Sequence, residues 1–313
     1  MNATTQSDAA GDDSYAARLG QRLTTACKYT NAAIVAALAV WFFVIPGFLV
    51  IRYISDPALR GPGIPQLAWD VHRKLTPRYE KWARERVASG RAAHLDLYDV
   101  PSTEWPIFGS VYYLWATEEL QKAWESDPRP SRQAPRDYAR AAIDAATELI
   151  LDPVHHTWVR EHWGDDYLHK ENVFFRALII AGLTARENLL KDGHHLDVLR
   201  DQVETLSAEL DASPFGVLND YPGECYPIDV FAAVACIRRA DAVLGADHSP
   251  FVARELRAFR GDMLDKRGLP PYFMDDPYKG KHSLPSRGIG NSYILIFAPH
   301  LYPEQARTWY EQY

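Results

Sequence analysis

The feature that most constrains this chain is an uncharged run of 20 residues, Ala32 to Ile51. A helix rises about 1.5 Å per residue, so a run of this length matches the hydrocarbon core of a bilayer, which is about 30 Å thick. We therefore expect residues 31–53 to form a hydrophobic anchor helix. Pro46 and Gly47 lie inside the run and leave two alternatives open, a bent or re-entrant segment and a helix buried in a soluble core.

The charges around this run bear on its orientation. Three basic residues precede it between positions 18 and 28, whereas Arg52 and Arg60 follow it and a denser basic series begins at Arg73. Because basic loops stay in the cytoplasm, this pattern favours a membrane-associated protein whose larger part lies on the cytoplasmic side. A cleaved signal peptide fits less well, since the polar tail of residues 1–30 is too long for such a leader. Cys27 is either a palmitoylation site or an inert thiol.

The composition is that of a folded globular protein. Of the 313 residues, 47% are hydrophobic and 24% are charged, which excludes a mainly disordered or fibrous chain. The net charge of −7 provides no basic field, so no nucleic-acid partner is expected. Three cysteines without a CxxC pair exclude a disulfide scaffold and a thiolate zinc site, and we assign no metal ligands.

Beyond the run, apolar residues recur at spacings of three and four, as along residues 138–150, which is typical of helices. We find no sustained alternating pattern of the kind that strands produce. Residues 1–13 are polar and acidic and are expected to be disordered. Further helices are predicted at residues 66–88, 106–125, 170–191, 195–211, 227–244, 250–266 and 288–300, with a short one at the C-terminus.

Two of these helices carry a stretch that is apolar almost all round, at residues 173–183 and 230–237, so both of their faces should be covered. By contrast, residues 195–211 and 250–266 carry a charge every two or three positions and should lie outside. Buried and exposed helices that alternate along a chain predict an all-α fold, an α/α toroid of two concentric layers over residues 60–313. In such a ring the loops that precede the inner helices surround a central cavity, where we expect the chemistry.

The first such loop is Thr103 to Gly109, which leads into an aromatic-rich helix. At the mouth of an aromatic cavity, desolvation raises the pKa of a carboxyl group and makes Glu104 a proton donor. The plain alternative is that Thr103 caps the helix and Glu104 only interacts favourably with the helix dipole.

The second stretch is Trp163 to Asn172. Its Asp165–Asp166 pair lacks the third carboxylate of a diphosphate or metal motif, so we expect one of the two to cap a helix. Glu171 and Asn172 should face either the cavity or a neighbouring helix.

The third stretch, Asn219 to Pro227, is the densest cluster of ionisable groups. Pro227 suits the first turn of a helix, which leaves Cys225 just outside the N-terminus, where the dipole lowers the pKa of a thiol. Asp220 and Glu224 oppose that effect and favour a proton-donating thiol over a thiolate. A buried structural cysteine is the alternative.

The fourth stretch is Tyr272 to Tyr278, followed by Arg287 to Ser292. Its glycines let the backbone approach a ligand closely, and Arg287 is suited to bind a carboxylate or phosphate, although a simple helix-entry turn explains the same residues. The sequence contains no GxSxG, Walker, dinucleotide or HExxH motif.

Three segments of the chain, two of them overlapping the stretches described above, together resemble a known family. His169 to Phe174, then Ser213 to Gly216, and then Asn219 to Tyr221 with Cys225 are similar to the bacterial linalool dehydratase/isomerase family. The resemblance covers about residues 100–313. It implies an α/α barrel that needs no cofactor, forms an oligomer, interconverts tertiary and primary terpene alcohols and dehydrates them.

The family's functional residues carry over only in part. Cys225 matches the second of two active-site cysteines and Tyr221 matches a tyrosine, whereas the first cysteine has no counterpart. The family's histidine, methionine and later tyrosine fall near Leu178, Phe174 and Ile289. Its aspartate comes from an early loop, where Asp96 and Asp99 are positional candidates. The resemblance thus implies a shared scaffold with altered chemistry, in a toroid that is incomplete or closed by partner copies.

The leading hypothesis is a cofactor-independent lyase or isomerase that acts on a small hydrophobic, isoprenoid-like substrate at a membrane. Aromatic rings would stabilise an allylic cation, while acidic groups and the thiol move protons. The alternatives are an α/α-barrel glycan-active enzyme with paired carboxylates, and a non-catalytic, membrane-tethered scaffold that binds lipid. The predicted catalytic residues are Glu104, Glu171, Asp220, Tyr221, Glu224 and Cys225; the predicted substrate-binding residues are Trp105, Phe108, Tyr112, Asn172, Phe174, Tyr226 and Arg287.

Overall fold

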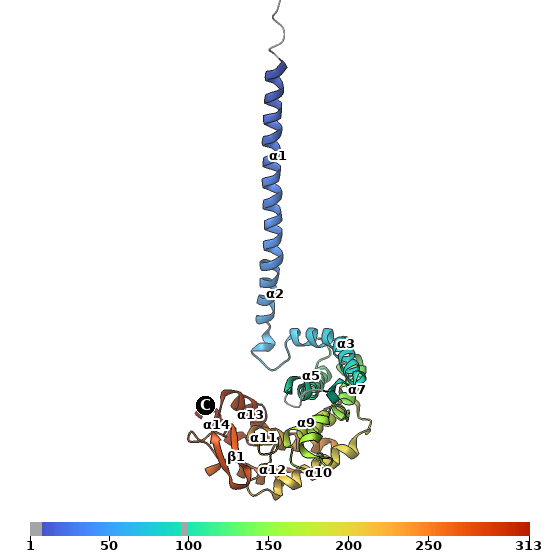
Figure 1. The fold of residues 1–313 in the computed structure, drawn as a ribbon, viewed down its shortest axis with the longest axis vertical. Coiled ribbons are helices and arrows are strands. Elements are labelled where there is room, and N and C mark those ends of the chain that lie inside the picture. The colour runs from blue at the N-terminus through green and yellow to red at the C-terminus, as the bar shows by residue number, and fades with distance from the viewer. Residues whose placement is uncertain (1–7, 95–98) are drawn as a thin grey trace, which may run out of the picture. The chain divides into compact units, whose positions relative to one another are not determined.

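The computed structural model describes residues 8–94 and 99–313 (Figure 1). Contacts between residues divide the chain into an N-terminal unit that ends at Ala68 and a larger unit, Trp69–Tyr313. The fold is mostly helical, as the sequence predicts, with one small hairpin in the larger unit.

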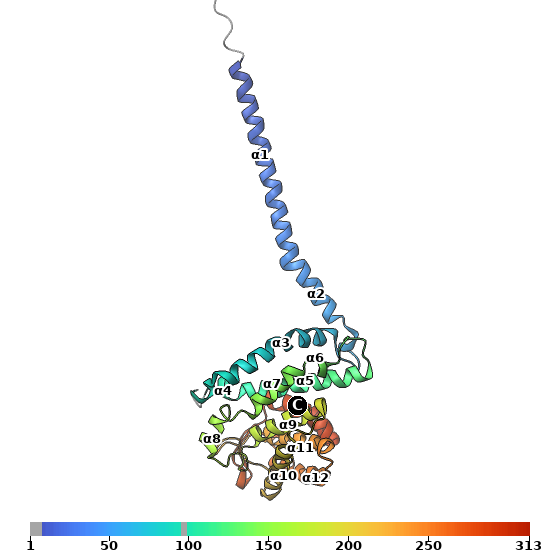
Figure 2. The same cartoon turned by 90° about the vertical axis from the view of Figure 1, so that its right-hand side faces the viewer.

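The N-terminal unit is built around one long helix with a wide turn in its middle. Helix α1 (Asp8–Ala39) continues through a π-helical turn (Val40–Val44) into α2 (Ile45–Ile54), and a 3-10 turn follows at Pro57–Leu59. The wide turn lies directly before Pro46, which has no N–H to donate to the preceding turn. Figure 2 shows the bend between α1 and α2, in agreement with the predicted bent segment.

The part of this helix from Arg18 to Ile54 is long and apolar enough to span a membrane, with a mean hydropathy of 2.7 in its most apolar window. Its side chains are almost all exposed rather than packed. The prediction of a disordered tail over residues 1–13 is wrong for residues 8–13, which belong to α1. Residues 1–7 lie outside the described part of the chain.

The larger unit contains most of the helices. The predicted ones are present as α3 (Gln66–Ser89), α5 (Trp105–Ser126), α7 (Arg140–Leu151), α9 (Val173–Leu190), α10 (Leu196–Ala212), α11 (Pro227–Leu244), α12 (Ser249–Glu255), α13 (Gly288–Leu301) and α14 (Pro303–Gln312). Three short helices, α4 (Val100–Thr103), α6 (Pro135–Tyr138) and α8 (Thr157–Trp163), lie between them.

These helices form a buried series and a covering series. In the buried series, α9 packs against α5 and α11, and α11 packs against α13. Helix α13 also contacts α5, because the ring centroids of Phe297 and Trp115 lie 6.1 Å apart. The covering helices are α7 on α5 and α9, α10 on α9 and α11, and α14 on α13. As predicted, α9 and α11 are largely buried, whereas α10 has one exposed face.

Two segments differ from the sequence-based expectation. The helix predicted for residues 250–266 ends at Glu255 and continues as 3-10 turns at Leu256–Phe259 and Gly261–Met263. Gly261, the first residue of the second turn, adopts a φ of 61°, which an α-helix does not accommodate. Strands β1 (Phe273–Asp276) and β2 (Lys281–Leu284) pair in an antiparallel hairpin. Each strand has four residues, too few to give a sustained alternating pattern.

Gly182 provides a test of this packing, because a Cβ atom there would lie 2.7 Å from Ile150 Cδ1 of α7 and 3.5 Å from Val111 Cγ2 of α5. Gly182→Val should overpack the contact and destabilise the protein by about 1–3 kcal/mol. The midpoint of thermal unfolding, followed by circular dichroism in detergent, measures the change.

Gly109→Ala is the matched control, since Gly109 is helical and a Cβ there meets nothing within 4 Å. This variant should be neutral or more stable by about 0.5–1 kcal/mol, because glycine loses more backbone entropy on folding than alanine. An unchanged midpoint for Gly182→Val would contradict the close approach of α9 to α7.

Candidate functional site

A cavity of about 560 Å³ lies where several helices begin. The starts of α5, α9 and α11 all contribute to its wall, together with α8, the loop before α11 and the segment before β1. Loops that precede buried helices therefore converge on one hollow, as the layered pattern predicts. Its lining residues are Glu104, His162, Phe174, Asp220, Tyr221, Pro222, Glu224, Tyr226, Ile228, Asp229 and Tyr272.

The first acidic group in the cavity is Glu104, which is only 8% exposed. The Tyr221 hydroxyl donates a hydrogen bond of 2.5 Å to Glu104 Oε2. Burial raises the pKa of Glu104, and this hydrogen bond opposes the rise. The pKa of Tyr221 is raised far above its usual range by burial and by the Glu104 charge, so the tyrosine keeps its proton and remains the donor.

The second acidic group is a pair formed by Asp220 and Asp229. Asp220 Oδ1 accepts the backbone N–H of Phe174 at 3.0 Å, and Oδ2 accepts that of Tyr226 at 3.1 Å. Asp229, in the first turn of α11, shares a side-chain hydrogen bond with Asp220. Burial raises the pKa of both carboxyl groups, and raises that of Asp229 to about 8.

The hydrogen bonds of Asp220 and its burial act in opposite directions on its pKa. Both oxygens of Asp220 accept backbone N–H groups, which favours the ionised form of that residue. Burial and the neighbouring Asp229 charge nevertheless raise the pKa of Asp220 well above its usual value, so the two carboxyl groups hold one proton between them. The cavity therefore contains an un-ionised carboxyl group near neutral pH.

Cys225 lies beside this cluster but does not line the cavity. Its side chain is fully buried, and its backbone oxygen accepts the N–H of Met274 at 2.9 Å, which ties the loop to β1. Burial and the nearby Asp220 charge raise the pKa of the thiol well above its usual value. The expected lowering by the helix dipole is therefore wrong, whereas the expected opposition from a carboxylate is confirmed for Asp220, because desolvation and carboxylate repulsion dominate.

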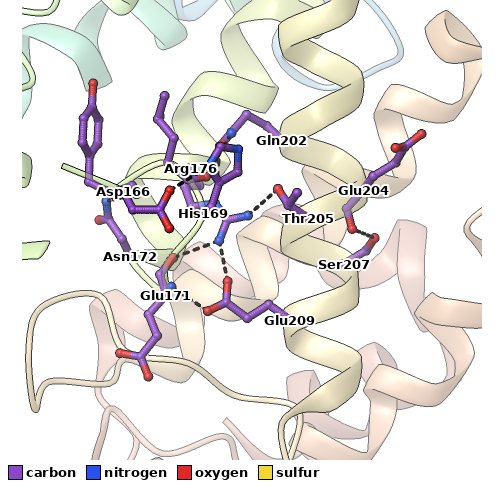
Figure 3. Close-up of polar contacts among 12 residues, drawn as sticks. Asp166, His169, Glu171, Asn172, Arg176, Gln202, Glu204, Thr205, Ser207 and Glu209 are labelled. Atoms are coloured by element: carbon purple, nitrogen blue, oxygen red, sulfur yellow. Dashed lines mark hydrogen bonds and ion pairs between the residues drawn. The ribbon is translucent and has the colours of Figure 1, made fainter. Parts of the chain in front are cut away.

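Glu171 and Asn172 also lie outside the cavity lining. Both adopt left-handed backbone conformations, with φ of 40° and 52°, immediately before α9. Glu171 Oε2 accepts a hydrogen bond of 3.0 Å from Asn219 Nδ2, and its backbone N–H donates to Glu209 Oε1 at 2.7 Å. In Figure 3 the Glu171 carboxylate extends away from Arg176. These two residues shape the entry to α9.

A buried cation, Arg176, stabilises this strained turn (Figure 3). Its guanidinium is fully buried and donates to Glu209 Oε2 at 2.6 Å, to Thr205 Oγ1 at 2.8 Å and to the backbone oxygen of Glu171 at 3.4 Å. Glu209 therefore neutralises Arg176 with one oxygen and holds the Glu171 backbone with the other. This arrangement fixes the turn that directs the Phe174 N–H towards Asp220.

The Asp165–Asp166 pair does not cap a helix. Asn172 occupies the N-cap position of α9, and Asp166 Oδ1 instead contacts His169 Nδ1 at 3.0 Å on the surface. Across the described ranges, no group of three or more His, Cys, Asp or Glu side chains is arranged to hold a metal ion.

The expected cap at Thr103 is also absent. Its hydroxyl donates to the backbone oxygen of Asp99, and Glu104 occupies the N-cap position of α5 without a side-chain hydrogen bond to the helix. Of the two positional candidates for an early-loop aspartate, Asp99 does not line the cavity and Asp96 lies outside the described residues.

The predicted substrate-binding residues separate into two sets. Phe174 and Tyr226 line the cavity, and Glu224 at its rim accepts a hydrogen bond of 2.9 Å from the Tyr226 hydroxyl. Phe108 packs behind Phe174, with ring centroids 5.6 Å apart, and Tyr112 packs on Phe108.

Two other predicted binding residues do not reach the cavity lining. Trp105 is 57% exposed. The Arg287 guanidinium carbon lies 4.6 Å from the ring centroid of Tyr272, so Arg287 contacts a lining residue rather than the cavity itself.

Asp229 and His162 were not predicted as site residues. The signal for Asp229 was its place in the first turn of a helix whose next turns are apolar, which brings the carboxyl close to the buried end of that helix. His162 had none, since it lies on α8, which the sequence does not predict. Its ring meets that of Tyr221 edge-on, with centroids 5.6 Å apart.

The fold and the site together define a mostly helical protein with an acidic, aromatic-lined cavity. Comparison with protein-family models finds no match, and comparison with curated proteins finds none either. The function must therefore be argued from the geometry of the cavity.

Glu209→Ala tests the buried ion pair. The substitution leaves the Arg176 cation without its carboxylate and removes the acceptor for the Glu171 N–H, so it should destabilise the protein by about 3 kcal/mol. Urea unfolding followed by circular dichroism measures the difference. Glu204→Ala, at an exposed position on the same helix, should change stability by less than about 0.5 kcal/mol.

The Asp220–Asp229 pair predicts a pH dependence of stability. A carboxyl group whose pKa is higher in the folded state binds more protons when folded, so its contribution is complete below about pH 4 and is lost as the pH rises towards 8. One such proton changes the free energy of unfolding by up to about 1.4 kcal/mol per pH unit.

Asp229→Asn keeps the shape of the neutral acid but cannot ionise. Compared with the unmodified chain, its stability between pH 5 and pH 8 should fall less steeply. Parallel slopes for the two proteins would show that the aspartate pair holds no extra proton.

Proposed function

We propose that the protein is a membrane-anchored, cofactor-independent lyase or isomerase that acts by acid–base chemistry on an apolar, isoprenoid-like alcohol. The observation that carries this proposal is the contact between the Asp220 and Asp229 carboxyl groups, which share a proton and line the same cavity as the hydrogen-bonded Glu104–Tyr221 pair. One group is ready to give a proton and the other is able to accept one.

In the proposed reaction, Asp229 transfers its proton to the substrate hydroxyl. The carbon–oxygen bond then breaks, water leaves with the electron pair of that bond, and an allylic cation remains. Glu104 removes a proton from a carbon next to the cation, and the electrons of that C–H bond form the new double bond. Exchange with water then returns a proton to Asp229 and removes one from Glu104.

Isomerisation uses the same groups. Water adds to the other end of the allylic cation, and its excess proton returns to Asp229, so the hydroxyl has moved and the acid is regenerated. Tyr221 is a positioning residue in this scheme, because it holds Glu104 in place through its hydrogen bond.

Three rings in the cavity wall, Phe174, Tyr226 and Tyr272, provide the faces that stabilise a carbocation. Ile228 and Pro222 add apolar surface that suits a hydrocarbon chain. The carboxyl groups lie among these side chains, where low polarity strengthens their effect on developing charge.

The wider architecture supports the same proposal. Buried and covering helices alternate along the larger unit, which is compatible with the predicted α/α toroid, and the resemblance to the linalool dehydratase/isomerase family implies the reaction type and an oligomer. The helix Arg18–Ile54 would anchor the chain in the membrane, with the larger unit on the cytoplasmic side. Apolar alcohols partition into that membrane.

A glycan-active enzyme is the second candidate. It is favoured by the presence of two carboxyl groups, Glu104 and Asp229, on the wall of one open cavity next to tyrosine rings. The substrates accepted by the protein distinguish the two candidates.

The decisive experiment incubates the purified full chain, in detergent or vesicles, with a panel of terpenoid alcohols, terpenoid diphosphates and oligosaccharides, and identifies products by mass. We expect dehydration or isomerisation of an alcohol. Glu104→Gln and Asp229→Asn should each lower turnover by about 10²–10⁴-fold, because each removes a proton-transfer group. Asp165→Asn, at an exposed carboxyl outside the cavity, should retain full turnover.

Cleavage of an oligosaccharide alone would favour the second candidate, and full turnover by Asp229→Asn would refute the mechanism. Cys225→Ala separates the two interpretations of the thiol. Retained turnover removes Cys225 from the mechanism, as its burial outside the cavity suggests.

A further inference from the structure

Helix α3 has two apolar faces, and only one of them packs within the protein. Trp69, His72, Thr76, Tyr79 and Ala83 form the buried face. About 100° around the helix axis from that face, Val71, Leu75 and Trp82 are 51%, 45% and 40% exposed. At 3.6 residues per turn, these three side chains lie within about 40° of one another around the helix axis. They form a continuous stripe rather than scattered surface residues.

The stripe has unpaired positive charges beside it. Lys74 and Arg78 are exposed next to it, and among the described residues neither has an ion-pair or hydrogen-bond partner. Helix α3 as a whole carries six basic and three acidic side chains, although the chain has a net charge of −7. Arg86 lies over the Trp82 ring, 5.9 Å from its centroid.

We infer that the stripe of Val71, Leu75 and Trp82 lies on the surface of an anionic bilayer, with Lys74 and Arg78 beside it at the lipid phosphates. The inference rests on the membrane anchoring in the proposed function, because α3 begins at Gln66, soon after the candidate span ends at Ile54. The length of the connecting segment keeps the helix within reach of the membrane surface.

The chemistry of the stripe favours lipid over a protein partner. Tryptophan concentrates at the boundary between headgroups and hydrocarbon, and long basic side chains extend from there to the phosphates. Each lysine or arginine near an anionic surface contributes about 1 kcal/mol. The cores of protein interfaces are instead depleted of charge, whereas Lys74 and Arg78 border this stripe.

The buried face of α3 relates the proposed bilayer contact to the cavity, because this face packs on α5. His72 lies 2.8 Å from Thr117 Oγ1, and the Tyr79 hydroxyl donates to Ser110 Oγ at 2.7 Å. The two helices are therefore antiparallel, and the C-terminal end of α3 lies beside the start of α5, where Glu104 is located. A bilayer beneath α3 would thus lie near the start of α5, where an apolar substrate arrives from lipid.

The test places a probe on the stripe. In the full chain with Cys27→Ser, the variant Leu75→Cys is labelled with a small fluorophore, while Cys225 and Cys236 are buried. The protein is reconstituted in vesicles of phosphatidylcholine and phosphatidylserine that contain a nitroxide-labelled lipid. We expect loss of fluorescence for the Leu75 probe and none for a probe at Glu204→Cys, on the exposed face of α10.

A charge variant tests the electrostatic part. Lys74→Gln with Arg78→Gln should reduce the quenching of the Leu75 probe in phosphatidylserine vesicles. Lys170→Gln with Lys266→Gln removes two exposed cations elsewhere and should leave it unchanged. Quenching that does not depend on phosphatidylserine would refute the role of the two cations.

Flotation of the vesicles separates this inference from the anchor itself. If the chain floats with the vesicles and the Leu75 probe is not quenched, the stripe does not lie on lipid, whereas the proposed anchoring by the N-terminal helix is supported. If the chain does not float, the membrane anchoring of the proposed function fails. A probe that is shielded only at high protein concentration would assign the stripe to a second copy of the chain and overturn the inference.

Discussion

The structure of the site depends on the burial of Asp220. Its two oxygens accept N–H groups from the first turn of α9 and from the residue before α11, so one carboxylate joins the starts of two buried helices. Because a second carboxyl, Asp229, lies against it, the pair is stable only with a shared proton. The strained turn at Glu171 and Asn172, held by Glu209 and Arg176, directs one of these N–H groups towards the carboxylate.

Burial makes one of two neighbouring residues, Asp229, easier to titrate near neutral pH and makes the other, Cys225, harder to titrate there. Burial raises the pKa of Asp229 and that of Cys225. For the carboxyl, the rise moves the pKa into the neutral range, where a proton can be both given and taken. For the thiol, the rise moves the pKa away from that range, and its side chain has no surface in the cavity. The ordinary pKa of each group, together with its position relative to the cavity, therefore decides which of the two can exchange a proton near neutral pH.

Most of the helices could be predicted because their pattern is local. The limits of α11 follow from Pro227 and from an apolar run that must be covered on both faces, and the structure places it at the predicted residues. The site was harder to predict, because its pairs join residues far apart in sequence. Glu104 and Tyr221 meet only through the packing of α5 near the loop before α11, and no local pattern reveals that Asp229 faces Asp220.

The wide turn at Val40–Val44 has a consequence for any neighbour of the N-terminal helix in a membrane. A π-helical turn inserts one residue, which rotates everything beyond it by about 100° around the helix axis. The helix face that carries the small side chains of Ala32, Ala33, Ala36 and Ala37 therefore points in a different direction in α2. A straight second helix that packs along these alanines would therefore lose contact with the N-terminal helix at Trp41, Phe42 and Phe43 of the wide turn.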